Sequence, residues 1–288
     1  MCFDTEYQLR RQLKEAKEQG MPAEEVEKIE EQLRKIFNGN NFRSNGELDL
    51  PVYYHVSGTD HPLMVSLTNQ GMILAEWGFI SSLARSIEDV YDNYDKPWMN
   101  SLNVVSETMF EKKTFKDSAY NRRCVVSLDS YYEHHHATGK TYPFRIMQKE
   151  NKPLWIAAVY NKGELLDPES GEIISKTSLG FLTCKANEAI ARIHNNPAMV
   201  KRNGHRMLVI LEQHQIKDYL QANPLEKSVE FEEKILSLCQ PYPENNLSFH
   251  TTRNLRHRKE MPYVGNVSEV REPFVWPELM LDRNNVPF

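Results

Sequence analysis

The feature that most constrains the fold of this chain is a series of short apolar runs, rich in β-branched and aromatic residues, that begins near residue 50. Runs of this length and composition predict β-strands. They cover residues 52–55, 64–68, 73–80, 124–128, 143–146, 154–159, 180–184 and 207–211. Helical patterns are fewer and cover residues 82–95, 186–196, 214–222 and 228–238. Because strands dominate without strict alternation with helices, the sequence predicts an α+β fold with a curled mixed sheet.

The two ends of the chain differ from this central pattern. Residues 4–36 are polar with a helical period, since apolar side chains recur there at three- and four-residue intervals. The last residues carry several prolines among aromatic residues, which is typical of an extended segment over a surface. We find no linker that would divide the chain. We therefore expect a single domain over residues 1–260, with a helical N-terminal insertion over about 4–38, and an extended C-terminal tail over residues 261–288.

Composition limits the class of protein. The chain has 288 residues, of which 40% are hydrophobic and 26% charged, as in ordinary soluble globular proteins. Its apolar runs are too short to cross a bilayer, and four scattered cysteines with no basic and apolar leader predict a reduced, cytoplasmic protein without membrane partners. The net charge of −5 argues against a general nucleic-acid coat but is compatible with a local basic groove.

Several familiar motifs fail on inspection. Gly139-Lys140-Thr141 resembles the end of a phosphate-binding loop, but His134 stands where that motif needs its first glycine. Three consecutive histidines, residues 134–136, suggest a metal site, yet neighbouring side chains on a strand point to opposite faces and cannot converge on one ion. We therefore expect no metal and no cofactor.

The beginning of the chain carries a distinctive chemical possibility. Removal of Met1 would leave Cys2 with an α-amino group and a thiol on adjacent carbons. Such a 1,2-aminothiol can trap an aldehyde as a five-membered thiazolidine ring. Its amine and thiol titrate near about 8 and 8.5, so reactive forms exist at neutral pH. By its position alone, Cys2 is better interpreted as a chance residue on a frayed terminus. Other segments of the chain must decide whether it is reactive.

An ordered set of short segments supplies that context. With Cys2 in front, they are WGFI at 77–80, NVVSET at 103–108, RRCVV at 122–126, SYYE at 130–133, IHN at 193–195 and HRM at 205–207. In this order, through about residue 222, the chain resembles the SOS response-associated peptidase (SRAP) family. Its pattern is an N-terminal Met-Cys, WGxIP, NARxET, RRC, GFYEW and IHxRMP. The resemblance implies a barrel-like mixed sheet flanked by helices and an extra N-terminal insertion.

The resemblance also implies a reaction and its residues. Members of this family cross-link abasic sites in single-stranded DNA. The corresponding catalytic residues are Cys2, Asn103, Glu133 and His194. Cys2 would form the thiazolidine, and Glu133 would transfer protons as a general acid and base. Asn103 would hold the terminus or substrate, and His194 would assist opening of the sugar ring, with His205 as its rival.

Basic and aromatic residues provide candidate DNA contacts. These are Trp77, Lys112, Lys113, Arg122, Arg123 and Arg206. Trp77 would stack beside the lesion, although a buried core tryptophan is an equal alternative at this apolar position. A further basic run, residues 253–259, would extend the groove or form a solvated loop.

The chain also departs from the family pattern. Val105 replaces the arginine of NARxET, Ser130 replaces the glycine of GFYEW, and His134 replaces its tryptophan. Ser81 and Leu208 replace the two prolines. A long segment, residues 195–205, separates His194 from Arg206. These changes bear on DNA affinity more than on reactivity.

The sequence therefore predicts an abasic site processing protein in the DNA damage response, in the cytoplasm and nucleoid-associated when bound to single-stranded DNA. An imine intermediate implies weak lyase activity, and the family name implies a peptidase limited to residues that precede Cys2. Two alternatives remain: a non-catalytic single-stranded DNA-binding member, supported by Val105 and the acidic charge, and a thiol peptidase with Cys2 as nucleophile and His194 as base.

Overall fold

Two sheets organise the part of the chain that the computed structural model describes, residues 3–37, 49–91, 102–222, 228–256 and 265–281. The larger sheet closes into a five-stranded barrel. Around the barrel the strands follow in the order β10 (Ile173–Lys185), β4 (Gly71–Trp77), β3 (Leu63–Thr68), β6 (Arg123–Leu128) and β9 (Leu154–Leu166), and β9 pairs back to β10. The β10–β4 pair is parallel and the others are antiparallel, so the sheet is mixed. The predicted α+β class with a barrel-like mixed sheet is confirmed.

Three short strands extend the barrel. β5 (Asn103–Val105) and β11 (Arg206–Leu208) both pair with β10, and β12 (Ile210–Leu211) pairs with β9. β10 thus carries the segments of the two predicted site residues Asn103 and Arg206 at one end of the barrel.

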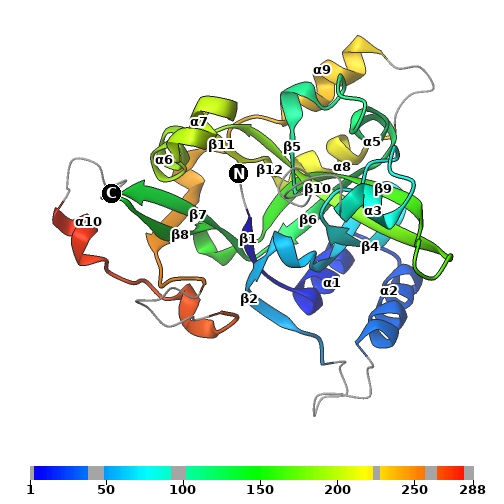
Figure 1. Ribbon diagram of the computed structural model, residues 1–288, viewed down its shortest axis with the longest axis horizontal. Helices are drawn as coiled ribbons and strands as arrows, with labels where there is room; N and C mark the ends of the chain where they lie inside the picture. Colours follow the sequence, from blue (N-terminus) through cyan, green and yellow to red (C-terminus); the bar gives the residue numbers. More distant parts are fainter. Residues whose placement is uncertain (1–2, 38–48, 92–101, 223–227, 257–264, 282–288) are drawn as a thin grey trace.

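The second sheet has five antiparallel strands. Their order is β13 (Leu247–Thr251), β8 (Lys140–Gln148), β7 (Ser130–Ala137), β1 (Asp4–Gln8) and β2 (Val52–Ser57). The first strand of the chain therefore lies between β7 and β2, as Figure 1 shows in dark blue.

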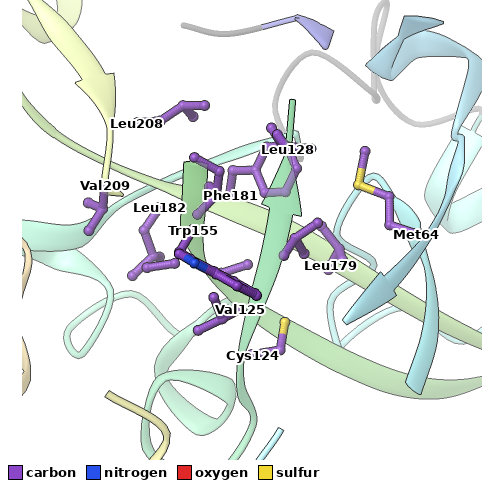
Figure 2. Packing of buried hydrophobic residues seen from close by; sticks show 14 of the residues in the cluster. Met64, Cys124, Val125, Leu128, Trp155, Leu179, Phe181, Leu182, Leu208 and Val209 are labelled. Carbon is purple, nitrogen blue, oxygen red and sulfur yellow. The ribbon is translucent and has the colours of Figure 1, made fainter. Parts of the chain in front are cut away.

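Aliphatic and aromatic side chains fill the barrel. β6 is buried along its whole length, as expected for a strand covered on both faces. Figure 2 shows its Val125 and Leu128 among Trp155 of β9 and Phe181 of β10, all within one hydrophobic cluster. This cluster also takes in Val26, Ile29 and Leu33 of the apolar helix face predicted over residues 26–36. The fourth residue of that predicted face, Ile36, is instead 53% exposed.

Helices cover the barrel and connect its strands. α1 (Leu9–Glu18) contacts β3 and β6, and α2 (Ala23–Ile36) contacts β4. The shorter helices are α3 (Ile87–Tyr91), α5 (Lys116–Asn121), α6 (Glu188–Ile193), α7 (Pro197–Asn203), α8 (Ile216–Leu220), α9 (Val229–Leu238) and α10 (Pro277–Leu281). Within the described ranges, no helix has the length and apolar character needed to span a membrane.

The structure corrects the predicted ends of the chain. Residues 4–8 form strand β1, whereas a helix was predicted from residue 4. Asp4 and Glu6 alternate with Thr5 and Tyr7, and both acids are buried. Because buried strand positions are usually apolar, this pattern does not look like a strand in the sequence. The predicted tail is also more than an extended strap, since residues 268–271 form a 3₁₀ turn and α10 follows. Residues 38–48, 92–101, 257–264 and 282–288, on which other predictions fall, lie outside the described residues.

Gly58 permits the close approach of three segments. A Cβ atom built there would lie 2.8 Å from a methyl carbon of Leu102 and 3.0 Å from the Trp77 ring. Its amide donates to the carbonyl oxygen of Phe3 at 2.7 Å. The absence of a side chain at Gly58 therefore lets the start of β1 lie against the segment before Asn103.

We predict that Gly58→Ala lowers the free energy of unfolding by about 1–3 kcal/mol, the usual effect of overpacking a filled core. Gly163→Ala is the matched control, because a Cβ there has its nearest neighbour at 3.8 Å. Urea denaturation measures both variants. Equal stability of the two would contradict the proposed close packing at Gly58.

Candidate functional site

The start of β1 is the point around which the predicted site residues are arranged. Cys2 lies outside the described residues, and Phe3 is the first residue of the structure. Asp4 pairs with Tyr132 of β7, the neighbour of Glu133, and with Ser57 of β2. The chain thus enters β1 beside the segment that carries Glu133.

Glu133 is buried on the central strand β7. Its side chain belongs to a residue only 4% exposed, and its register partner on β8 is Phe144. The carboxyl group of Glu133 is thus largely shielded from solvent.

Asn103 is the first residue of β5. It is 7% exposed and pairs with Phe181 of β10. The preceding Leu102 lies against Gly58, which binds the Phe3 carbonyl oxygen. Leu102, the residue before Asn103, is therefore linked through Gly58 to the N-terminal segment.

His194 ends α6 and is held by two backbone contacts. Its Nδ1 lies 3.0 Å from the carbonyl oxygen of Arg206. Because a carbonyl oxygen only accepts, Nδ1 donates the hydrogen in this bond. The rival His205 places its own Nδ1 3.0 Å from the carbonyl oxygen of His194, so it braces the backbone at His194.

A polar junction joins the His194 segment to β7. The Asn195 side chain accepts from the His136 amide at 2.7 Å and donates to the His136 carbonyl oxygen at 3.0 Å. His135 Nδ1 donates to the carbonyl oxygen of Arg192 at 2.9 Å. These contacts bring the loop after α6 to the strand of Glu133. In Figure 1, α6, α7 and β11 lie on one side of the N-terminal end of β1 and β5 lies on the other.

The three described cysteines are poor candidates for reaction. Cys124, Cys184 and Cys239 are all buried and unbridged. Burial raises the pKa of the Cys184 thiol to about 12 and raises the pKa of Cys124 and Cys239 further. Thiols of this kind carry almost no thiolate at neutral pH. Among the cysteines of the sequence, this leaves Cys2 as the candidate nucleophile.

Two predicted DNA contacts are parts of the core. Trp77 has no exposed surface, and its indole N–H donates to the carbonyl oxygen of Leu102 at 2.9 Å. Arg123 is 5% exposed and directs its guanidinium to backbone carbonyl oxygens, including those of Ala119 at 2.6 Å and Tyr219 at 2.8 Å. These positions support the core alternative for Trp77. Neither Trp77 nor Arg123 is placed to contact DNA at the surface.

Two further predicted contacts are arginines already paired with acids. Arg206 is 7% exposed and makes a bidentate ion pair with Glu107, with N–O distances of 2.7 and 2.6 Å. Arg122 is half-buried and pairs with Asp117. Lys112 and Lys113 are exposed and remain open for DNA contact.

A buried charge network below β1 escaped the sequence analysis. Asp4 and Glu6 are 0% and 1% exposed. Glu6 accepts from Ser130 at 2.5 Å and from Nε of Arg145 at 2.8 Å, and Arg271 lies 2.9 Å from its other oxygen. The only sequence signal for this network was the alternation of acids at residues 4 and 6.

Asp4 is the second centre of that network. Its Oδ1 accepts from Nε2 of His55 at 2.9 Å and also from Arg256. Burial opposes ionisation, but the His55 hydrogen bond and the neighbouring His134 and Arg256 hold the pKa of Asp4 below its ordinary value. The carboxylate is therefore charged at neutral pH and fixes β1 by charge-assisted contacts.

Comparisons with known proteins relate the chain to one family. A family model described as SOS response associated peptidase (SRAP) matches residues 21–255. The chain is 28% identical over 226 residues to abasic site processing protein YoqW of Bacillus subtilis, a match that covers 76% of this chain and 86% of that protein. It is 26% identical over 232 residues to abasic site processing protein YobE of the same organism, covering 78% and 90%.

A solved structure shows the same fold. A protein from Bacteroides thetaiotaomicron superposes with a TM-score of 0.66 at 23% sequence identity, covering 88% of this chain and 93% of that one. At this identity the likeness concerns the fold alone.

His134 predicts a specific pH dependence of stability. Burial lowers its pKa below the ordinary 6.5, with Arg256 and His136 adding to the effect while Asp4 and Glu133 oppose it. As pH falls, His134 therefore binds its proton in the unfolded chain at a higher pH than in the folded chain. The free energy of unfolding consequently decreases as the pH falls from about 6.5 to the lower pKa of the folded state. We expect His134→Gln to lose less unfolding free energy than the wild type between pH 7.5 and 5.5.

Urea denaturation at both pH values checks this expectation. His214→Gln is the control, because His214 is exposed on the surface, and its pH dependence should follow the wild type. Parallel curves for wild type and His134→Gln would contradict the assignment.

Proposed function

Because the chain belongs to the SOS response associated peptidase (SRAP) family, whose model matches residues 21–255, we propose that it processes abasic sites in DNA by covalent capture at Cys2. The observation that carries the proposal is the convergence of the Asn103, Glu133 and His194 segments on the entrance of β1, two residues after Cys2. The names of YoqW and YobE support DNA with abasic sites as the substrate.

The reaction balances with water as its only by-product. Opening of the abasic sugar exposes an aldehyde. The Cys2 amine adds to its carbonyl carbon and loses water to form an imine. The Cys2 sulfur then adds to the imine carbon, the thiol proton goes to nitrogen, and the ring closes as a thiazolidine. Removal of Met1 must come first, and the peptidase activity implied by the family would be limited to that step.

The buried polar groups match the proton transfers that these steps need. Glu133 would take a proton from the attacking amine or thiol and return one to the leaving oxygen, a role that typically contributes about 10²–10⁴-fold. His194 would assist opening of the sugar ring. Asn103 would hold the terminus or sugar by an amide that donates and accepts without changing charge. The imine intermediate would also permit a weak strand-cleaving lyase activity.

The DNA surface is best assigned to exposed cations beside the site. Residues 189–211 contain no aspartate or glutamate, which is unusual in a chain with a net charge of −5. Within this segment Arg192, Lys201 and Arg202 are exposed and form no ion pair with any carboxylate in the described ranges. Together with Lys112 and Lys113 they would bind phosphates of a single strand on both sides of the lesion. Cytoplasmic and nucleoid localisation remain predictions.

The capture chemistry predicts different adducts for different first residues. After incubation with a single-stranded oligonucleotide carrying one abasic site, the wild type should show the DNA mass in intact mass spectrometry without any reductant. Cys2→Ser keeps the amine and lacks the thiol, so its adduct should survive only when borohydride reduces the imine. A stable unreduced adduct of Cys2→Ser would contradict ring closure, and no wild-type adduct with Met1 removed would favour the binding-only alternative.

Charge reversal at Lys201 and Arg202 tests the DNA surface. With an oligonucleotide carrying a tetrahydrofuran site, which has no aldehyde, Lys201→Glu/Arg202→Glu should weaken binding by about tenfold or more. The slope of log affinity against log salt should shrink by about 1.4, or 0.7 for each lost phosphate contact. Fluorescence anisotropy from low to high salt measures both quantities.

Lys162→Glu/Lys217→Glu is the matched control, because both lysines are exposed and lie on β9 and α8. An equal loss of affinity and slope in the control would show that net charge alone matters, and would contradict a contact surface at α7.

A further inference from the structure

The C-terminal part of the chain lies against the face of the five-stranded sheet that carries Asp4 and Glu6. We call its described residues, 252–256 and 265–281, the C-terminal segment. Thr252 donates to the carbonyl oxygen of Val270, and Trp276 Nε1 donates to the carbonyl oxygen of Thr252 at 3.0 Å. Internal hydrogen bonds thus join the two described parts of the segment into one unit.

Apolar contacts attach this unit to the sheet. Val270 and Leu255 form a buried cluster with Tyr132 of β7. Trp276 and Leu279 form another with Tyr142 of β8. The segment is therefore packed on β7, a direct neighbour of β1, and on β8 beyond it.

The edge of the sheet is also covered. Asn266 accepts from the Tyr54 amide at 2.7 Å and donates to the Val52 carbonyl oxygen at 2.9 Å. These two bonds imitate a strand partner for β2, the outer neighbour of β1. Both strands that flank β1 are consequently in contact with the C-terminal segment.

Two arginines of the segment reach β1 itself. Arg271 places Nε 2.9 Å from Glu6 Oε1, and Arg256 donates to Asp4 Oδ1 and, at 3.1 Å, to Ser57 Oγ. Fully buried carboxylates are strongly unfavourable without opposite charges and donors. Within the sheet, Arg145 and Ser130 donate to Glu6 and His55 donates to Asp4. Arg271 and Arg256 add to these partners, so part of the compensation for both acids comes from the other end of the chain.

This contact lies outside the part of the chain that the family model matches. The match covers residues 21–255, whereas Asp4 and Glu6 precede it and Arg256 and Arg271 follow it. The ion pairs between the two ends of the chain are therefore not implied by the match to the family model.

We propose that the C-terminal segment is a clamp on β1, and that Arg256 and Arg271 are positioning residues for the reaction at Cys2. The clamp rests on the proposed function. It acts through β1, whose first residue Asp4 lies two residues after Cys2. Small displacements of a nucleophile slow a reaction strongly because the reacting atoms must meet in one geometry. Loosening β1 would spread the aminothiol over many positions while leaving the DNA surface intact.

The first test measures β1 directly and needs no DNA. Arg256→Ala and Arg271→Ala should each speed amide hydrogen exchange in residues 4–8 by about tenfold, a change of about 1.4 kcal/mol in local opening. Arg271→Lys keeps the charge and should lie between the alanine variant and the wild type. Glu272→Ala is the control, because Glu272 is exposed in the same segment and directly follows Arg271.

The second test separates positioning from DNA binding. Adduct formation with an abasic oligonucleotide is followed at several DNA concentrations. The clamp predicts that Arg256→Ala and Arg271→Ala lower the maximal rate by about tenfold with an unchanged half-saturating DNA concentration. Glu272→Ala should leave the maximal rate unchanged. A raised half-saturating concentration with a normal maximal rate would show that Arg256 binds phosphate, and would overturn the clamp.

The two tests distinguish an error in the proposed function from an error in the clamp. If the wild type forms no adduct, the proposed function is wrong, and the exchange rates still decide whether the segment holds β1. Exchange in residues 4–8 that is the same in all variants would overturn the clamp whatever the adduct experiment shows.

Discussion

The burial of two carboxylates on the first strand is the constraint on which this architecture depends. Asp4 and Glu6 are buried on β1, an interior strand of the five-stranded sheet, where a charged group without donors is strongly unfavourable. Their compensation comes from β2 through His55, from β8 through Arg145 and from the C-terminal segment through Arg256 and Arg271. Segments from both ends of the chain must be in place before either acid is satisfied.

The barrel supplies the other half of the site. Because β10 pairs in parallel with β4 and β5 and antiparallel with β9 and β11, one long strand orders the segments of Asn103 and Arg206. The Arg206 backbone then fixes the ring of His194, and its side chain is tied to Glu107. The proposed reaction would therefore take place between strands of the barrel and strands of the five-stranded sheet. This supports preorganisation of the acid–base groups around a short N-terminal segment.

Sequence patterns predicted the elements whose apolar period is strong. The runs that became β3, β6 and β9 and the face of α2 formed by Val26, Ile29 and Leu33 are of this kind. β1 could not be recognised, because its alternating residues are buried acids and only the tertiary partners make that favourable. Trp77 and Arg123 show the same limit. Whether an indole or guanidinium meets DNA or a backbone carbonyl depends on contacts distant in sequence, as Trp77 with Leu102 and Arg123 with Tyr219 show.

The central claim is that the first residue of the mature chain is the point of covalent capture. The most direct measurement is tandem mass spectrometry of the cross-linked protein after nuclease and trypsin digestion. The account predicts that the sugar remnant lies on the peptide of residues 2–10, at Cys2, with Met1 absent. A remnant on a lysine elsewhere, or a peptide that still begins with Met1 and carries the adduct, would contradict it.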